Sequence, residues 1–361
     1  GSSVYSSTTM GAGNTRIYAH WERTWAADAV DVNLSGLGGS GTTSDPYVID
    51  SPTDIAFLAL QTSKNVTFDG KYFKQTANID LAGKTWLPIG NATTAFQGSY
   101  DGNGYLITNI TTIANGQLNY SNVGLFGYTR NATIKNVNII SGTIRGYDYV
   151  GSIVGNLNNG SVENCRSGAT VTGYNYVGMI GYGVSTSILS SYNYGSVSGN
   201  DYVGGILGYN DGTGTRLENC YMKGSVTATA SEANCGGILG QTTSGITLQS
   251  CGFIGSVTGG SNTGLLTGNL NGGSVIDCFA NSTTNYDFTK GSGTVKSSLY
   301  IQNKDSNNPV KKYVTHNSET NPFANWTIAV NNQPLPIGFV WLGKGGEGLN
   351  VAKLISLGYS N

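Results

Sequence analysis

Val203-Gly-Gly-Ile-Leu-Gly208 decides the fold of this chain, because variants of the same phrase recur at a nearly constant interval. Each copy sets apolar residues between glycines, and the closing glycines of successive copies lie 28, 26, 27, 32 and 28 residues apart. Self-similarity at periods of about 20–50 residues is typical of solenoids, propellers and repeat arrays. The other copies are Val123-Gly-Leu-Phe-Gly127, Val150-Gly-Ser-Ile-Val-Gly155, Val177-Gly-Met-Ile-Gly181, Cys235-Gly-Gly-Ile-Leu-Gly240 and Thr263-Gly-Leu-Leu-Thr-Gly268.

A second phrase follows each glycine phrase and indicates how one repeat is shaped. In Val162-Glu-Asn-Cys-Arg-Ser167, strand alternation turns the first, fourth and sixth residues inward and makes the polar pair a corner. We expect the side chains of the corner column to form a ladder of hydrogen bonds between repeats. This column comprises Asn136, Asn164, Ser190, Asn219, Ser250 and Asp277.

A third short strand completes each repeat. Its inward residues are Ile144, Val171, Val197, Val226 and Val257. Three short strands and three bends per repeat predict an all-β fold, a right-handed parallel β-helix whose coils stack about 4.8 Å apart. We expect the glycines to serve the bends, because glycine readily adopts positive φ.

The composition agrees with this fold and excludes several classes of partner. The chain has 361 residues, of which 54 are Gly, 22 are Tyr and only 11% are charged, a mixture too apolar for disorder and too poor in helix formers for a helical protein. The formal net charge is −1 and no Lys/Arg cluster is present, so we predict no nucleic-acid partner. No apolar run approaches the roughly 18 residues of a membrane span, so we predict no membrane insertion.

The residues that introduce and carry the repeat resemble a known family. The glycine phrase, followed by Asn-Cys and then by Gly-Ser-Val-Thr-Gly, resembles the GLUG repeat of bacterial surface proteins, and the segment up to Phe96-Gln-Gly-Ser-Tyr-Asp-Gly-Asn-Gly104 looks like what commonly precedes it. Near the start, Tyr18-Ala19-His20-Trp21 resembles the end of a Listeria-Bacteroides surface repeat. The GLUG resemblance implies a secreted or surface-anchored bacterial β-solenoid, often attached to adhesins or large extracellular enzymes, and carries no catalytic residues.

These observations divide the chain into four parts. We expect residues 1–30 to be the remnant of a preceding small β-repeat module and linker, and residues 31–120 to form an N-terminal cap and first coil. Within this cap, Ser51-Pro52-Thr53 followed by apolar residues at helical spacing predicts a helix. Residues 121–281 are the solenoid repeats, and residues 282–361 form a C-terminal cap with a possible short helix near Leu349 to Leu357. Other domains of a longer polypeptide are expected partners.

The cysteines and histidines predict neither a cofactor nor a metal site. Four of the five cysteines, namely Cys165, Cys220, Cys251 and Cys278, share one inward column, and Cys235 lies in another. In-register thiols that point the same way favour reduced, buried side chains over disulfides. The only histidines, His20 and His316, are far from the cysteines in sequence.

Two carboxylate pairs raise the possibility of an enzyme, since parallel β-helices also host polysaccharide lyases and glycosidases. Asp148 and Asp201 occupy equivalent corners two coils apart, as do Glu163 and Glu218 on an outward face. Two coils span about 9.6 Å, near the upper end of the separation in inverting glycosidases. Nothing else in the sequence supports catalysis, so we predict that the chain is not an enzyme, with a polysaccharide-degrading enzyme as the alternative.

Outward tyrosines are the candidate binding residues. They are Tyr147, Tyr149, Tyr174, Tyr176 and Tyr202, with Tyr128, Tyr182 and Tyr209 as a possible second stripe. Stacked tyrosines can hold a sugar ring or anchor a protein, but they can also simply stabilise the sheet by pairing with each other. The leading hypothesis is therefore an extracellular or cell-surface module that mediates adhesion or acts as a rigid display stalk, with a host or bacterial glycan or protein as the ligand.

Overall fold

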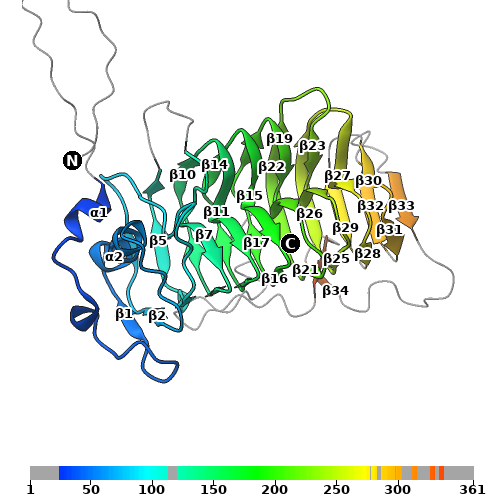
Figure 1. The fold of residues 1–361 in the computed structure, drawn as a ribbon. Helices are drawn as coiled ribbons and strands as arrows, with labels where there is room; N and C mark the ends of the chain where they lie inside the picture. Colours follow the sequence, from blue (N-terminus) through cyan, green and yellow to red (C-terminus); the bar gives the residue numbers. More distant parts are fainter. Residues whose placement is uncertain are drawn as a thin grey trace, which may run out of the picture.

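The protein is nearly all β, and parallel sheets form a β-solenoid of about 8 turns with few helices, as predicted (Figure 1). This computed structural model describes residues 24–112, 120–276, 278–282, 286–296, 298–302, 310–314, 326–329 and 333–336. The predicted surface-repeat remnant at Tyr18 to Trp21 and the helix near Leu349 to Leu357 lie outside these residues. The domain boundaries stay a prediction.

The first sheet contains one short strand from each turn of the solenoid, preceded by β1 and β2 from the N-terminal segment. Its ten strands pair in parallel and in chain order, each with the equivalent strand of the next coil. They are β1 (Tyr47–Ile49), β2 (Tyr72–Gln75), β4 (Ser99–Asp101), β8 (Thr133–Lys135), β12 (Ser161–Glu163), β16 (Ser187–Leu189), β21 (Thr215–Glu218), β25 (Ile246–Gln249), β28 (Ser274–Ile276) and β31 (Thr294–Lys296).

The second sheet contains two short strands from most coils, one at the end of the second phrase and one that is the third predicted strand, and they merge into one strand at β22. Along the main path run β3 (Ile79–Asp80), β5 (Leu106–Thr108), β9 (Asn138–Ile139), β13 (Arg166–Ser167), β17 (Tyr192–Asn193), β22 (Tyr221–Ala228), β18 (Val197–Gly199), β14 (Thr170–Thr172), β10 (Gly142–Arg145) and β6 (Ile110–Thr111). Off this path lie β26 (Gly252–Thr258), β29 (Phe279–Ser282), β32 (Ser298–Gln302) and the antiparallel β33 (Val310–Val314).

The third sheet carries the glycine phrases. Its strands are β7 (Phe126–Arg130), β11 (Asp148–Asn158), β15 (Asn175–Val184), β19 (Asp201–Gly204), β20 (Leu207–Asn210), β23 (Asn234–Gly236), β24 (Leu239–Thr242), β27 (Asn262–Leu270) and β30 (Asp287–Gly291). The register between β11 and β15 shifts between Gly151 and Val154, because the phrase in β11 has one residue more than that in β15. A separate pair joins β34 (Trp326–Ala329) to β35 (Gln333–Pro336).

The helices found among the described residues lie at the N-terminal end of the stack (Figure 1). They are α1 (Trp25–Asp28), the 3-10 helix η1 (Leu34–Leu37) and α2 (Pro52–Ser63). The predicted helix is confirmed in α2, where Ser51 and Asp54 form a capping box and Pro52 occupies the first turn. Phe57 of α2 packs on Phe68, which contacts Phe73 of the first sheet, so aromatic side chains cover this end of the core.

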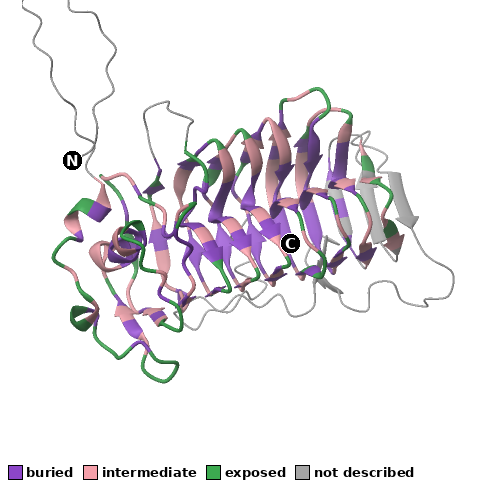
Figure 2. Cartoon of the chain, viewed as in Figure 1, coloured by how far each residue is buried: buried purple, intermediate pink, exposed green. Residues whose placement is uncertain are grey.

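The inward columns form one continuous core along the solenoid axis (Figure 2). Val162, Cys165 and Ser167 are all fully buried, as the alternation of the second phrase predicts. The equivalent apolar residues of the other described coils are also buried, and each column stacks one residue on its equivalent in the next coil, which explains why the phrases recur at a nearly constant interval.

The predicted role of the glycines in the phrase is wrong. None of the closing glycines of the phrase has positive φ. A Cβ at any of Gly127, Gly155, Gly181, Gly208, Gly240 or Gly268 would instead lie 2.6 Å or less from a backbone atom, so these positions need glycine because backbones approach closely. Positive φ does occur at Gly142, Gly224 and Gly255, near the bend before the third strand.

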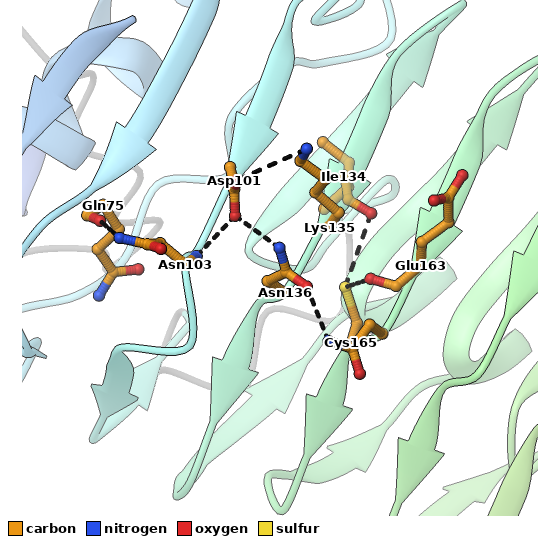
Figure 3. Close-up of polar contacts among 9 residues, drawn as sticks. Gln75, Asp101, Asn103, Ile134, Lys135, Asn136, Glu163 and Cys165 are labelled. Carbon is orange, nitrogen blue, oxygen red and sulfur yellow. Dashed lines mark hydrogen bonds and ion pairs between the residues drawn. The ribbon is translucent and has the colours of Figure 1, made fainter. Parts of the chain in front are cut away.

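The corners are made by asparagine and serine. Asn136, Asn164, Ser190, Asn219 and Ser250 all have φ between 47° and 55°, the left-handed conformation that asparagine tolerates better than most residues. The predicted ladder forms in the first coils: Asn164 Nδ2 donates to Asn136 Oδ1 at 2.7 Å, and Asn136 Nδ2 donates to Asp101 Oδ1 at 2.8 Å (Figure 3). Thus one side-chain column ties three successive turns together.

Candidate binding surface on the tyrosine face

The candidate tyrosines lie at the start of the strands of the third sheet. Tyr149 in β11, Tyr176 in β15 and Tyr202 in β19 each precede a fully buried valine, and these valines are paired in register. Parallel pairing places equivalent side chains of neighbouring coils beside each other. The three tyrosines therefore form one column, which we call the inner tyrosine stack.

The rings of the inner tyrosine stack lie face to face. The ring centroids of Tyr149 and Tyr176, and of Tyr176 and Tyr202, are both 4.9 Å apart, with interplanar angles of 6° and 7°. The backbone of all three residues is left-handed, with φ of 55–58°. Such a conformation costs a bulky residue on the order of 1–2 kcal/mol, so the surrounding structure has to compensate it.

A second pair of tyrosines packs against the edges of this stack. Tyr182 and Tyr209 stack on each other at 5.5 Å, and they meet the inner stack in edge-to-face contacts, for example Tyr176 with Tyr209 at 5.2 Å and 75°. Tyr128 does not join them, because Asn156 lies between it and Tyr182 in the register. The predicted second stripe is therefore wrong at this position, where Tyr128 instead accepts a hydrogen bond from Arg130.

Packing in this cluster changes the acidity of its hydroxyls. Burial, followed by the neighbouring tyrosines, raises the pKa of Tyr176 to about 12. Burial and the hydrogen bond that Tyr182 donates to Asp211 at 2.9 Å also raise the pKa of Tyr182. The hydroxyls of Tyr176 and Tyr182 therefore stay protonated at neutral pH and act as neutral hydrogen-bonding groups.

Tyr147 and Tyr174 form a separate, more exposed pair. Their ring centroids are 4.9 Å apart at an interplanar angle of 2°, and their side chains are 38% and 41% exposed. The backbone N–H of Tyr174 donates to the carbonyl of Tyr147 at 2.6 Å, so adjoining coils hold the two rings together. We call these two residues the outer tyrosine pair.

The first predicted carboxylate pair lies in one column, with a residue between its members. Asn175 pairs in register with both Asp148 and Asp201. The Oδ1 atom of Asp201 accepts hydrogen bonds from the backbone N–H of Tyr202 at 2.7 Å and from the backbone N–H and Nδ2 of Asn234 at 2.8 and 3.0 Å. Burial raises the pKa of Asp148. Asp201 therefore holds the backbone of two coils.

The second pair is arranged in the same way on the first sheet. Leu189 lies in register between Glu163 and Glu218. Glu218 forms an ion pair with Arg216 at 3.0 Å. Each glutamate is therefore separated from the other by an apolar side chain.

The cysteines are free and buried, as predicted. The thiol of Cys220 donates to the carbonyl of Ile188, one coil back, at 3.2 Å, and Cys165, Cys251 and Cys278 bond in the same manner. Burial raises the pKa of both Cys165 and Cys235 to about 12. Within the described ranges, no group of three or more His, Cys, Asp and Glu is placed to hold a metal ion. The histidines lie outside these ranges.

Sequence reasoning missed a second candidate surface. Tyr72, Lys74, Asp101 and Lys135 line one groove on the outer face of the first sheet, although they are up to 63 residues apart. The only signal in the sequence is polar alternation in short segments, and this signal becomes a site only when the register of β2, β4 and β8 is known.

No helix in the described part of the chain is long and apolar enough to cross a membrane.

Comparisons with known proteins agree with the fold. Halomucin of Haloquadratum walsbyi is 32% identical in an alignment 183 residues long that covers 47% of this chain and 2% of that protein. A protein of Evansella cellulosilytica named "Putative Gly-rich membrane protein" is 33% identical in an alignment 137 residues long that covers 35% of this chain and 15% of that protein. The chain thus spans a small part of both curated relatives.

A solved structure from Bacteroides ovatus, described as "a putative immunoglobulin A1 protease", superposes with a TM-score of 0.54 at 23% identity, covering 84% of this chain and 96% of that one. This similarity concerns the fold alone.

Residues 199–227 match the family model of the GLUG motif, and they include the glycine phrase from Val203 to Gly208. The chain is therefore a β-solenoid that carries the GLUG motif.

Proposed function

We propose that this chain is a rigid, surface-associated module that binds a glycan or protein ligand and thereby mediates adhesion. The ligand binds through the tyrosine face, the surface formed by the inner tyrosine stack and the outer tyrosine pair. The two curated relatives are named halomucin and a Gly-rich membrane protein, and these names support a location at the cell surface. The observation that carries the proposal is the outer tyrosine pair, Tyr147 and Tyr174, two exposed aromatic residues held in a fixed arrangement.

The rigidity of the outer pair favours binding. Both residues sit on neighbouring coils that are joined by backbone hydrogen bonds, so little side-chain freedom remains to be lost when a ligand binds. Tyrosine presents a large amphipathic area with a polar tip, which suits both sugar rings and protein side chains. We therefore assign recognition to Tyr147 and Tyr174.

The inner tyrosine stack has a supporting role in this proposal. The faces of Tyr176 are covered by Tyr149 and Tyr202, and edges of Tyr182 and Tyr209 meet the same rings. Such pairs each contribute about 0.5–1.5 kcal/mol beyond area burial. The stack stabilises this face of the solenoid, and Tyr176 at its centre has neither ring face free for a ligand.

We also propose that the chain acts by binding and not by catalysis. The hydrogen bonds on Asp201 and the residues interposed in both carboxylate pairs support this view. The measurement is incubation with a panel of acidic and neutral polysaccharides followed by detection of new reducing ends or unsaturated products. Product formation that is lost in Asp201→Asn would establish the enzyme alternative.

The binding proposal is tested with the double variant Tyr147→Ala/Tyr174→Ala on glycan arrays and on protein-coated surfaces. We expect loss of binding with little change in melting temperature, since both side chains are partly exposed. The matched control is Tyr105→Ala, which alters a tyrosine just before β5 in another sheet. Unchanged binding by the double variant refutes the assignment, and a wild-type chain that binds no surface favours the display-stalk hypothesis.

A further inference from the structure

A half-open groove lies on the outer face of the first sheet, at its N-terminal end and away from the strands that carry the tyrosine face. The segment 43–46 and the outward residues of β2, β4 and β8 enclose a volume of about 430 Å³. This volume falls within the roughly 300–1,000 Å³ of small-ligand pockets.

The register arranges the floor of the groove in two rows. Tyr72, Ser99 and Thr133 form the first row, because these residues pair in sequence across the three strands. Lys74, Asp101 and Lys135 form the second row in the same way. The residues between the rows, Phe73, Tyr100 and Ile134, point into the core and are buried, so the rows face outward.

The charged row has one positive charge in excess, and the acid within it is already engaged. The Oδ2 atom of Asp101 lies 3.6 Å from Nζ of Lys135. The Oδ1 atom of Asp101 accepts hydrogen bonds from the backbone N–H of Asn103 and from Nδ2 of Asn136, both at 2.8 Å (Figure 3). Lys74 forms no ion pair with any described residue. Its ammonium group can therefore receive an anionic group from a ligand.

The uncharged row supplies an aromatic ring and hydroxyl groups. Tyr72 is partly exposed and has no aromatic partner among the described residues, unlike Tyr149, Tyr176 and Tyr202, which stack face to face. Ser99 and Thr133 lie beside Tyr72 on the next two strands of the sheet, and Thr43 and Ser44 also line the groove. An aromatic platform beside hydroxyls suits a sugar ring, and a lysine suits its acid substituent.

We propose that this groove binds an acidic sugar unit of a polysaccharide. Its carboxylate pairs with the ammonium of Lys74, its ring lies on Tyr72, and its hydroxyls bond to Ser99 and Thr133. A single excess charge and a low overall charge favour a polymer with one acid per sugar over a nucleic acid, whose dense phosphates need a basic surface. This site is independent of the tyrosine face.

The test is isothermal titration calorimetry of the full chain with tetragalacturonate and a hyaluronan tetrasaccharide as acidic probes and cellotetraose as the neutral probe. We expect the acidic probes to bind more tightly, and their affinity to fall as salt rises because an exposed ion pair is screened. Lys74→Gln should weaken acidic binding about ten- to a hundredfold, as expected for a charge-assisted hydrogen bond. Lys74→Arg should retain most of it.

Matched variants distinguish binding in the groove from binding elsewhere on the chain. Lys64→Gln removes an exposed charge at the end of α2 outside the groove, and it should bind as the wild type does. Tyr147→Ala/Tyr174→Ala should also retain acidic binding, even if it abolishes adhesion. Equal affinity for cellotetraose, no binding of either acidic probe, or an unchanged affinity in a folded Lys74→Gln variant would each overturn the proposal.

Discussion

Replacement of Gly181 by alanine should strongly destabilise the solenoid, although alanine adds a single methyl group. A Cβ at this position would lie 2.6 Å from the carbonyl oxygen of Tyr176, 2.6 Å from the backbone nitrogen of Val150 and 2.7 Å from the carbonyl oxygen of Gly155. All three neighbours are backbone atoms, and two of them belong to the adjoining coil, so no side-chain rotation can relieve the contact.

The magnitude follows from how far the coils would have to move. The contacts are several tenths of an ångström shorter than real Cβ contacts, so β15 would have to separate from β11 where the parallel hydrogen bonds hold them together. Overpacking in a core usually costs about 1–3 kcal/mol. We expect the upper end, about 3 kcal/mol, because Gly181 is buried between two coils.

Urea unfolding followed by circular dichroism measures this effect, with Gly245→Ala as the control. A Cβ at Gly245 meets no atom within 4 Å, and we expect its midpoint to be unchanged. Gly181→Asn distinguishes a need for positive φ from a need for space, because asparagine tolerates positive φ but is larger than alanine. We expect it to be at least as destabilising as alanine. A Gly181→Ala midpoint equal to that of the control, or rescue by asparagine, would refute the close-approach argument.

Three further predictions concern the corner, the tyrosines and the thiols. Asn164→Ala should lower the free energy of unfolding in urea by about 2 kcal/mol, since it loses the hydrogen bond to Asn136 and leaves alanine at a φ of 50°. Asn164→Gly should lose the hydrogen bond but recover the part of this loss that comes from the backbone conformation. Equal losses in the two variants would contradict this explanation. The pKa of Tyr176 is raised to about 12 in the folded chain, so its contribution to the free energy of unfolding is complete below pH 10 and is lost as pH rises toward 12. The free energy of unfolding should therefore decline between pH 10 and 12, and it should decline less in Tyr176→Phe. All five cysteines should resist an exposed-thiol reagent in the native chain and react after unfolding; rapid labelling of Cys165 in the native state would be inconsistent with its burial.

Much of the fold could be predicted because the same local pattern recurs in successive coils. One copy of Val-Gly-Gly-Ile-Leu-Gly is ambiguous, but six copies at a near-constant spacing restrict the chain to stacked coils. The inward positions of Val162 and Cys165 and the corner at Asn164 followed from strand alternation. The role of the glycines in the phrase did not follow, because the need for glycine at Gly181 comes from the distance between two coils and not from its own backbone angles.

The sequence by itself determined the solenoid, its period, its core columns and the tyrosines that occupy its outer positions, because parallel stacking repeats one local pattern in each coil. Only the tertiary structure decided which tyrosine faces are free: the inner stack is packed by Tyr182 and Tyr209, whereas Tyr147 and Tyr174 remain exposed. It also assembled Tyr72, Lys74 and Lys135 into one groove. The physical reason is that contacts between coils depend on register, on one-residue bulges and on the path of segment 43–46, none of which is expressed in the pattern of a single coil.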